Sequence, residues 1–106
     1  MTGHVIVAGT DADGIGDALA ARTRIERVDV ANRPALEEAG IHEAIAYVLT
    51  ESEQATSIAV AKDLNPDLKV VVYASDSLPE FAKGQADLVV DPALLDADAV
   101  AEELLA

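Results

Sequence analysis

Short, unbroken runs of apolar residues recur along the chain, and segments with helical spacing separate them. One such run spans residues 45–49, and apolar positions then recur every three or four residues over residues 51–64. Asn65 and Pro66 stop that helix, because proline lacks an amide hydrogen and restricts the residue before it. Another apolar run follows at residues 69–74. Unbroken runs of this length are typical of strands buried on both faces, so the segment predicts a parallel strand–helix–strand unit.

The same unit is repeated on both sides of this segment, which predicts five strands and five helices. The strands are expected at residues 4–8, 24–30, 44–50, 69–74 and 86–90, and the helices at 16–22, 32–40, 51–64, 77–84 and from Asp91-Pro92 onward. Asn32 is a suitable N-cap, Gly40 a suitable residue past a helix end, and Ser77 to Glu80 a capping box. The pattern predicts a single domain over residues 1–106, a three-layer, Rossmann-like, doubly wound α/β fold with a parallel five-stranded sheet.

In a doubly wound sheet, ligands bind beyond the carboxyl ends of the strands, where the winding direction reverses. In this chain those ends lead into residues 9–13, 29–32, 50–52, 75–77 and Asp91. We therefore expect any nucleotide site at that edge of the sheet. Its candidate residues are Gly9, Thr10, Asp11, Asp13, Gly14, Gly16, Asp29, Thr50, Glu51 and Ser75.

Composition narrows the classes of function. Twenty acidic residues against seven basic ones give a net charge of −13, and such a surface repels nucleic acid and anionic membranes. The chain has no cysteine for disulfide or thiolate chemistry, and no signal peptide or membrane-spanning apolar run is recognisable, so we expect a cytoplasmic protein. An acidic, lysine-poor chain indicates a high-salt cytoplasm, as in a halophilic archaeon, where salt screens self-repulsion. An ordinary acidic protein is the alternative.

Several motifs follow one another from Asp29 onward. Asn32-Arg33-Pro34 leads into Leu-Glu-Glu-Ala-Gly-Ile at 36–41. Ala-Lys-Asp-Leu-Asn-Pro at 61–66 and Gln-Ala-Asp-Leu-Val-Val-Asp-Pro at 85–92 come next. In order and spacing these motifs resemble the TrkA-N or RCK family, the NAD-binding N-terminal domain of potassium-uptake regulators. The resemblance implies a Rossmann-like regulatory domain that binds a nucleotide, forms dimers and acts in potassium transport.

The first loop departs from the Gly-x-Gly-x-x-Gly pattern of that family, in which glycines let the backbone approach a pyrophosphate. Aligned through Gly16, the first two glycine positions fall on Asp11 and Asp13, whose charges repel a pyrophosphate. The family's second strand and helix also have no counterpart in this chain. The acidic residue that would hold the ribose of the cofactor is therefore missing. We therefore expect NAD(H) to bind weakly or not at all, and the family's strand order 3-2-1-4-5-6 to become 2-1-3-4-5.

Two groups of charged residues are candidates for a site. Asp11, Asp13 and Asp29 can converge on a Mg²⁺ ion, as acids do in receiver domains. Receiver domains also need an Asp after the third strand and a Lys after the fifth, and Thr50 and Asp91 stand there. The favoured alternative is that the three acids cap helices and solvate a loop. The second group is Arg22, Arg24, Arg27 and Arg33, which suits phosphates, although pairing with the acidic surface is favoured.

No catalytic constellation is recognisable, so we expect no enzymatic activity. Ser75 and Ser77 have no histidine base nearby, and Tyr47 and Tyr73 fall inside strands, where core positions are expected. Three hypotheses remain. The first is a stand-alone, shortened TrkA-N-like regulatory or interaction module; the second is a sensor of NAD, ATP or AMP linked to potassium transport; the third is a degenerate receiver-like, Mg²⁺-binding domain.

A homodimer is the expected assembly, because the resembling family forms dimers through this domain. The candidate contact residues are exposed apolar side chains near the C-terminus, namely Leu94, Leu95, Leu104 and Leu105. Neither nucleic-acid binding nor direct membrane insertion is expected of so acidic a surface.

Overall fold

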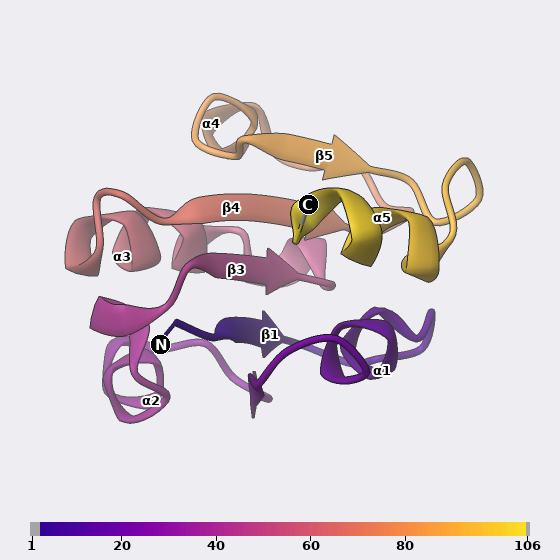
Figure 1. Ribbon diagram of the computed structural model, residues 1–106. Coiled ribbons are helices and arrows are strands. Elements are labelled where there is room, and N and C mark those ends of the chain that lie inside the picture. Colours follow the sequence, from indigo (N-terminus) through magenta and orange to yellow (C-terminus); the bar gives the residue numbers. More distant parts are fainter. Residues whose placement is uncertain (1–2, 106) are drawn as a thin grey trace.

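The computed structural model describes residues 3–105, which form one parallel sheet covered by helices on both faces (Figure 1). The strands are β1 (Val5–Ala8), β2 (Ile25–Val28), β3 (Ala46–Leu49), β4 (Lys69–Tyr73) and β5 (Leu88–Val90). They lie in the order β2-β1-β3-β4-β5, and every neighbouring pair is parallel. The predicted fold class and strand order are therefore confirmed.

Helices connect successive strands. They are α1 (Ile15–Ala20), α2 (Arg33–Glu38), α3 (Thr56–Leu64), α4 (Glu80–Lys83) and α5 (Ala97–Leu104), with short 3-10 turns η1 (Ile41–Glu43) and η2 (Ser52–Gln54). Side chains of α1 and α5 share a core with one face of the sheet, and side chains of α2, α3 and α4 share a core with the other. Among the described residues, no helix is long and apolar enough to cross a membrane.

The two cores explain why the strands read as unbroken apolar runs. Alternate residues of β1 serve opposite faces, with Ile6 in the core under α2 and α3, and Val7 in the core under α1 and α5. All four residues of β1 and all four of β3 are buried. Tyr47 and Tyr73 are fully buried, as their strand positions predicted.

Helix α5 begins later than the sequence pattern predicted. The N-cap is Asp96, whose side chain accepts a hydrogen bond from the Ala99 N–H at 2.9 Å. Asp91 instead accepts from the Ala93 N–H at 2.9 Å and closes a local turn. Both aspartates accept a hydrogen bond from an amide group two or three residues later. Such a hydrogen bond occurs in turns as well as at helix starts, so an aspartate in the sequence does not by itself identify a helix start.

The predicted capping box at Ser77 and Glu80 is wrong. Helix α4 has Pro79 at its N-cap and no side-chain hydrogen bond there. A proline disfavours helical backbone in the residue before it, so Leu78 does not join the helix and Ser77 is too far away to cap it. The expected helix over 51–64 is likewise split, with η2 preceding α3. By contrast, Asn32 caps α2 as predicted, accepting from the Ala35 N–H at 2.9 Å.

Candidate functional site

In the loop after β1, the carboxylate of Asp11 binds the backbone amide groups at the start of α1. Asp11 Oδ1 accepts a hydrogen bond from the Gly16 N–H at 2.7 Å, and Oδ2 accepts from the Asp17 N–H at 3.2 Å. Gly14, with a φ of 79°, makes the left-handed turn that brings the loop back. The amide groups at the start of this helix are thus satisfied by an anion from within the chain.

Arg27, on β2, completes this arrangement. Its guanidinium donates to Asp11 at 3.1 Å and to Asp17 at 3.0 Å. A Cβ at Gly16 would lie 2.9 Å from the Asp11 carboxylate and would collide with the Arg27 guanidinium. The space that the missing side chain of Gly16 leaves is therefore filled by this ion pair.

A second polar cluster joins the ends of β1 and β3. The Thr50 hydroxyl lies 3.1 Å from the Ala8 carbonyl oxygen and 2.5 Å from that of Thr10, so these two carbonyls share its proton. The Thr10 N–H donates to Glu51 Oε2 at 3.0 Å. Gly9 has a φ of 101°, and a Cβ there would lie 2.5 Å from Thr50 Oγ1. The gap between β1 and β3, where a doubly wound sheet usually receives its ligand, is therefore bridged by the chain itself.

Gln54 ties a third loop to this cluster. Its amide nitrogen donates to Glu51 Oε1 at 2.8 Å and to the Asp29 carbonyl at 2.9 Å, and its amide oxygen accepts from the Ala31 N–H at 2.8 Å. The Gln54 hydrogen bond, followed by that of Thr10, holds the pKa of the Glu51 carboxyl below its ordinary value. Glu51 is therefore an anion at neutral pH, at the centre of the loop cluster.

The structure brings some of the predicted site residues together and leaves others apart. One hydrogen bond joins Gly16 to Asp11, and a separate set joins Thr10 to Thr50 and Glu51, with Gly9 in close contact with Thr50. Asp29 joins the second set through its backbone carbonyl, which accepts from Gln54. Ser75 is exposed and does not contribute a side-chain hydrogen bond within residues 3–105. Three acids that could hold a metal ion do not occur together in this part of the chain. The convergence of Asp11, Asp13 and Asp29 on a cation, the less favoured of the two interpretations, is not observed; Asp11 is engaged by α1 and Arg27.

Asp13 lies instead near the carboxyl end of β4. Burial raises the pKa of Tyr73, and the negative charges of Asp13, Asp96 and Asp91 raise it further. The Tyr73 hydroxyl donates to the Leu95 carbonyl at 2.8 Å. This corner of the sheet edge is consequently both acidic and occupied by a neutral phenol.

All four arginines form ion pairs with acidic side chains, as the favoured interpretation, pairing with the acidic surface, predicted. Besides Arg27, the pairs are Arg22 with Asp98 at 3.6 Å, Arg24 with Glu26 at 3.1 Å, and Arg33 with Asp63 at 3.0 Å. Each arginine meets a different acid, so the four do not converge on one point. Sequence reasoning did not single out Gln54: besides Glu51, its partners Ala31 and Asp29 lie 23 and 25 residues away, and no local signal in the sequence marks these contacts.

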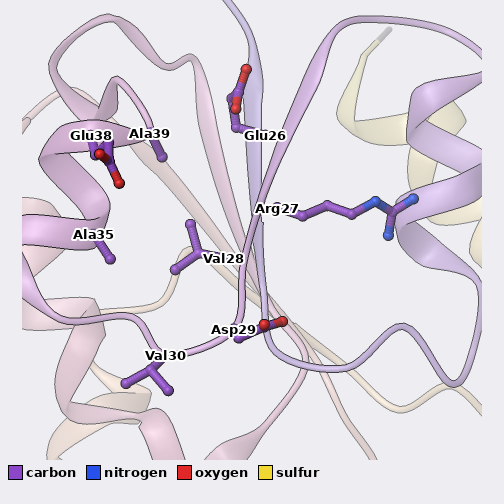
Figure 2. Close-up of a pocket in the computed structure, with 8 residues that line it drawn as sticks. All are labelled: Glu26, Arg27, Val28, Asp29, Val30, Ala35, Glu38 and Ala39. Carbon is purple, nitrogen blue, oxygen red and sulfur yellow. The ribbon is translucent and has the colours of Figure 1, made fainter.

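A groove of about 360 Å³ runs between β2 and α2 (Figure 2). It is lined by Glu26, Arg27, Val28, Asp29, Val30, Ala35, Glu38 and Ala39. Figure 2 shows Val28 pointing from β2 toward Ala35, whereas Arg27 points the other way. The groove lies on the outer side of an edge strand, and at Asp29 it adjoins the loop cluster.

Solved structures of similar fold belong to several kinds of protein. The TrkA-N domain of the inner membrane protein ybaL from Escherichia coli has a TM-score of 0.70 and 20% identity, covering 99% of this chain and 96% of that chain. A pilus assembly-related protein from Burkholderia pseudomallei has a TM-score of 0.68 and 18% identity, covering 98% and 87%. A response regulator from Burkholderia pseudomallei, with a phosphorylated aspartic acid, calcium and citrate, has a TM-score of 0.60 and 17% identity, covering 97% and 71%.

At these identities the likeness concerns the fold, which this chain shares with a TrkA-N domain and with a response regulator. No curated protein matches the chain. A family pattern does match it, over residues 5–104 of the 106, and its description is a family of unknown function, DUF7126. Because the match covers nearly the whole sequence, the chain belongs to the family DUF7126.

Proposed function

We propose that the domain is a shortened TrkA-N-like regulatory module that acts by contacting other proteins and catalyses no reaction. One observation carries the proposal: the Asp11 carboxylate takes the Gly16 and Asp17 amide groups at the start of α1. In a dinucleotide-binding fold, the corresponding amide groups receive the pyrophosphate of the cofactor. The chain supplies its own anion at that place.

Admitting a nucleotide would require this arrangement to open. Hydrogen bonds to a charged group contribute about 1.5–3 kcal/mol each, and Asp11 would lose those from Gly16, Asp17 and Arg27. A carboxylate that stayed in place would repel an incoming phosphate. Glu51 adds a second negative charge at the neighbouring loop, where it accepts from Thr10. These terms together favour weak or absent binding of NAD(H).

Titration calorimetry with NADH, ATP and AMP tests the proposal. We expect no binding by the unaltered chain, and we expect Asp11→Gly, which removes the anion, to be the variant in which any binding emerges. Asp17→Asn is the matched control, because it removes an Arg27 partner but leaves the helix amide groups occupied. Low-micromolar NADH binding by the unaltered chain would overturn the proposal in favour of a nucleotide sensor. Such a sensor could link nucleotide binding to the regulation of potassium transport.

A receiver-like, cation-responsive domain is a second candidate. Two observations favour it. The fold is shared with a response regulator, and the negative charges of Asp13, Asp91 and Asp96 act together at Tyr73, where they would attract a cation. A cation that binds only the folded state raises the melting temperature, and the rise continues with the logarithm of the cation concentration above its Kd. A rise with Mg²⁺ that KCl of equal ionic strength does not reproduce, and that Asp13→Asn abolishes, would support this candidate. Equal effects of the two salts would exclude it.

A further inference from the structure

Strand β2 is an edge of the sheet with unused hydrogen-bonding groups. Among residues 3–105 it pairs with β1 alone, and the Arg24 and Val28 carbonyls accept from the Val5 and Gly9 amide groups. Hydrogen-bonding direction alternates along a strand, so the N–H and C=O groups of the intervening Ile25 and Arg27 point outward. An extended chain laid beside β2 would find these groups in the spacing of a parallel or antiparallel ladder.

The groove beside this edge provides a place for a side chain. Val28 forms its floor at the strand, and Ala35 and Ala39 are small residues on the facing side of α2 (Figure 2). Val30, at one end, is 66% exposed, although it is a large apolar residue. A strand added at β2 would direct every second side chain into this groove, because side chains alternate between the two faces of a sheet.

The charges around the groove are acidic. Glu26, Asp29 and Glu38 line it; Arg24 pairs with Glu26 at 3.1 Å, whereas no described cation lies within ion-pair distance of Glu38. The Arg27 guanidinium faces α1 and is held by Asp11 and Asp17. A partner is therefore favoured if it brings a positive charge next to its apolar side chain.

We propose that the β2 edge and its groove bind an extended segment of a partner protein as an added strand. The segment carries an apolar side chain over Val28 and a Lys or Arg two positions away, near Glu26 and Glu38. Main-chain hydrogen bonds to Ile25 and Arg27 supply the affinity, and the groove supplies the specificity. The inference rests on the proposed function, since it names the surface and the kind of partner of that interaction module.

A second copy of the chain fits this edge poorly. A two-fold axis through β2 would bring the two grooves together, each lined by Glu26, Asp29 and Glu38, and like charges oppose such a contact. The net charge of −13 adds repulsion between copies and also disfavours nucleic acid. A basic, extended protein segment has neither difficulty.

The test uses synthetic peptides and the full chain. The probe is a blocked, fluorescein-labelled peptide of sequence Thr-Lys-Thr-Val-Thr-Lys-Thr, in which Lys, Val and Lys fall on one face in either strand direction. One control peptide has Glu in place of both Lys residues. The other keeps the sequence but carries N-methyl groups on alternate amides, which removes the ladder donors while keeping the charge. Fluorescence anisotropy is measured in the lowest KCl concentration at which circular dichroism shows the chain folded.

We expect the parent peptide to bind and both control peptides to fail. Glu38→Lys should weaken binding about tenfold, because an exposed attraction becomes a repulsion. Glu37→Lys makes the same charge change one position along α2 but outside the groove, and should leave binding unchanged. Equal weakening by both substitutions, equal binding of the N-methylated peptide, or no binding of the parent peptide would each overturn the inference. NADH titration is run in parallel to keep the two proposals apart. NADH binding would overturn the proposed function, whereas failure of peptide binding without NADH binding would overturn only the β2-edge inference.

Discussion

The hydroxyl group of Tyr47 is buried and, within the described part of the chain, has Ser57 as its one hydrogen-bond partner. It lies 2.7 Å from Ser57 Oγ, which itself donates to the Gln54 carbonyl at 2.6 Å, so the Tyr47 hydroxyl is the donor to Ser57. Burial raises the pKa of Tyr47 to about 12, and the Ser57 hydrogen bond offsets part of that effect. The phenol therefore stays neutral at physiological pH.

Removing either side of this hydrogen bond should have unequal effects on stability. Ser57→Ala leaves a buried phenol without a partner and should lower the free energy of unfolding by about 1–3 kcal/mol. Tyr47→Phe should lower it by about 1 kcal/mol, since Ser57 still donates to Gln54. The double variant should be more stable than the sum of the two effects implies. Urea unfolding of the four proteins measures this, and a larger loss for Tyr47→Phe would contradict it.

Asp87 links stability to pH. Its carboxylate accepts from the Val70 N–H at 2.7 Å and from Lys62 at 3.2 Å. The Val70 hydrogen bond is the main reason that the pKa of Asp87 is lowered, and Lys62 contributes less. A carboxyl whose pKa is lower when folded stabilises the fold above its unfolded-state pKa, and that contribution is lost as the pH falls through the folded-state pKa.

We predict that Asp87→Asn lowers the free energy of unfolding by up to about 1 kcal/mol at pH 7, a modest value because the site is partly exposed. The difference from the unaltered chain should shrink as the pH falls below about 4, because the unfolded state is protonated there first and the folded state only at a lower pH. Denaturant unfolding of both proteins between pH 7 and pH 3 gives the difference directly. A difference that does not vary with pH would show that the charge of Asp87 is not involved.

Residues whose partners are near in sequence were predictable, and residues whose partners are distant were not. Asn32 contacts an amide group three residues away, so local chemistry identified it as a cap. Gln54 and Arg27 reach partners 10 to 25 residues away, and only the folded sheet brings these together. Asp11 was recognised as a misplaced charge in a glycine loop, but its capture by Arg27 depends on β2 lying beside β1.

At the scale of elements, strands were easier to predict than helix starts. A strand buried on both faces needs every residue to be apolar, and few other structures in a soluble domain impose that pattern. A helix start needs one polar residue before a free amide group, which many turns also offer. Asp91 and Ser77 were misassigned for this reason, and Pro79 decided the second case by excluding Leu78 from the helix.

The turn that ends α3 also organises the entry to β3. Asn65 follows the last residue of the helix, and its side-chain amide donates to the Ile41 carbonyl at 2.9 Å and to the Ala44 carbonyl at 3.0 Å. Its side-chain oxygen accepts from the Asp67 N–H at 3.2 Å. One side chain thus fixes two turns that are more than 20 residues apart in the sequence.

Asn65→Asp should destabilise the domain by about 2 kcal/mol, because the substitution removes both donors and sets a carboxylate against two carbonyl oxygens. Asp67→Asn is the control, since it makes an exposed change two residues away and leaves these hydrogen bonds in place. Thermal unfolding followed by circular dichroism measures both variants. Equal melting temperatures for the two would show that Asn65 acts only as a helix stop.

At the scale of the whole molecule, charge dominates. We predict that the melting temperature rises between dilute and molar KCl, because salt screens the repulsion from a net charge of −13. Reversing Glu37, Glu102 and Glu103 to Lys, all exposed, adds two charges each and takes the net charge to −7, which should flatten the dependence. If the melting temperature of the unaltered chain is the same in dilute and in molar KCl, the halophilic interpretation is refuted.

Assembly through β5 is the second prediction at this scale, and we propose a homodimer. Phe81, Leu88, Val89, Leu94 and Leu95 are large apolar residues with 40–83% exposure around this edge, whereas Leu104 and Leu105 pack partly into the core. Burial of such a patch against its copy removes apolar surface from water. Light scattering in molar KCl should give a dimeric mass, reduced to a monomer by Val89→Lys but not by Val30→Lys. A monomeric mass for the unaltered chain would contradict this.

The strand order β2-β1-β3-β4-β5 leaves one open edge on each side of the same sheet. If β2 of one molecule paired with β5 of the next, the contact would repeat without closing and would build a filament. Mutual repulsion of acidic surfaces opposes that growth, and concentrated salt removes the repulsion. A partner strand seated on either edge terminates the polymer, so complex formation would also keep the domain dispersed.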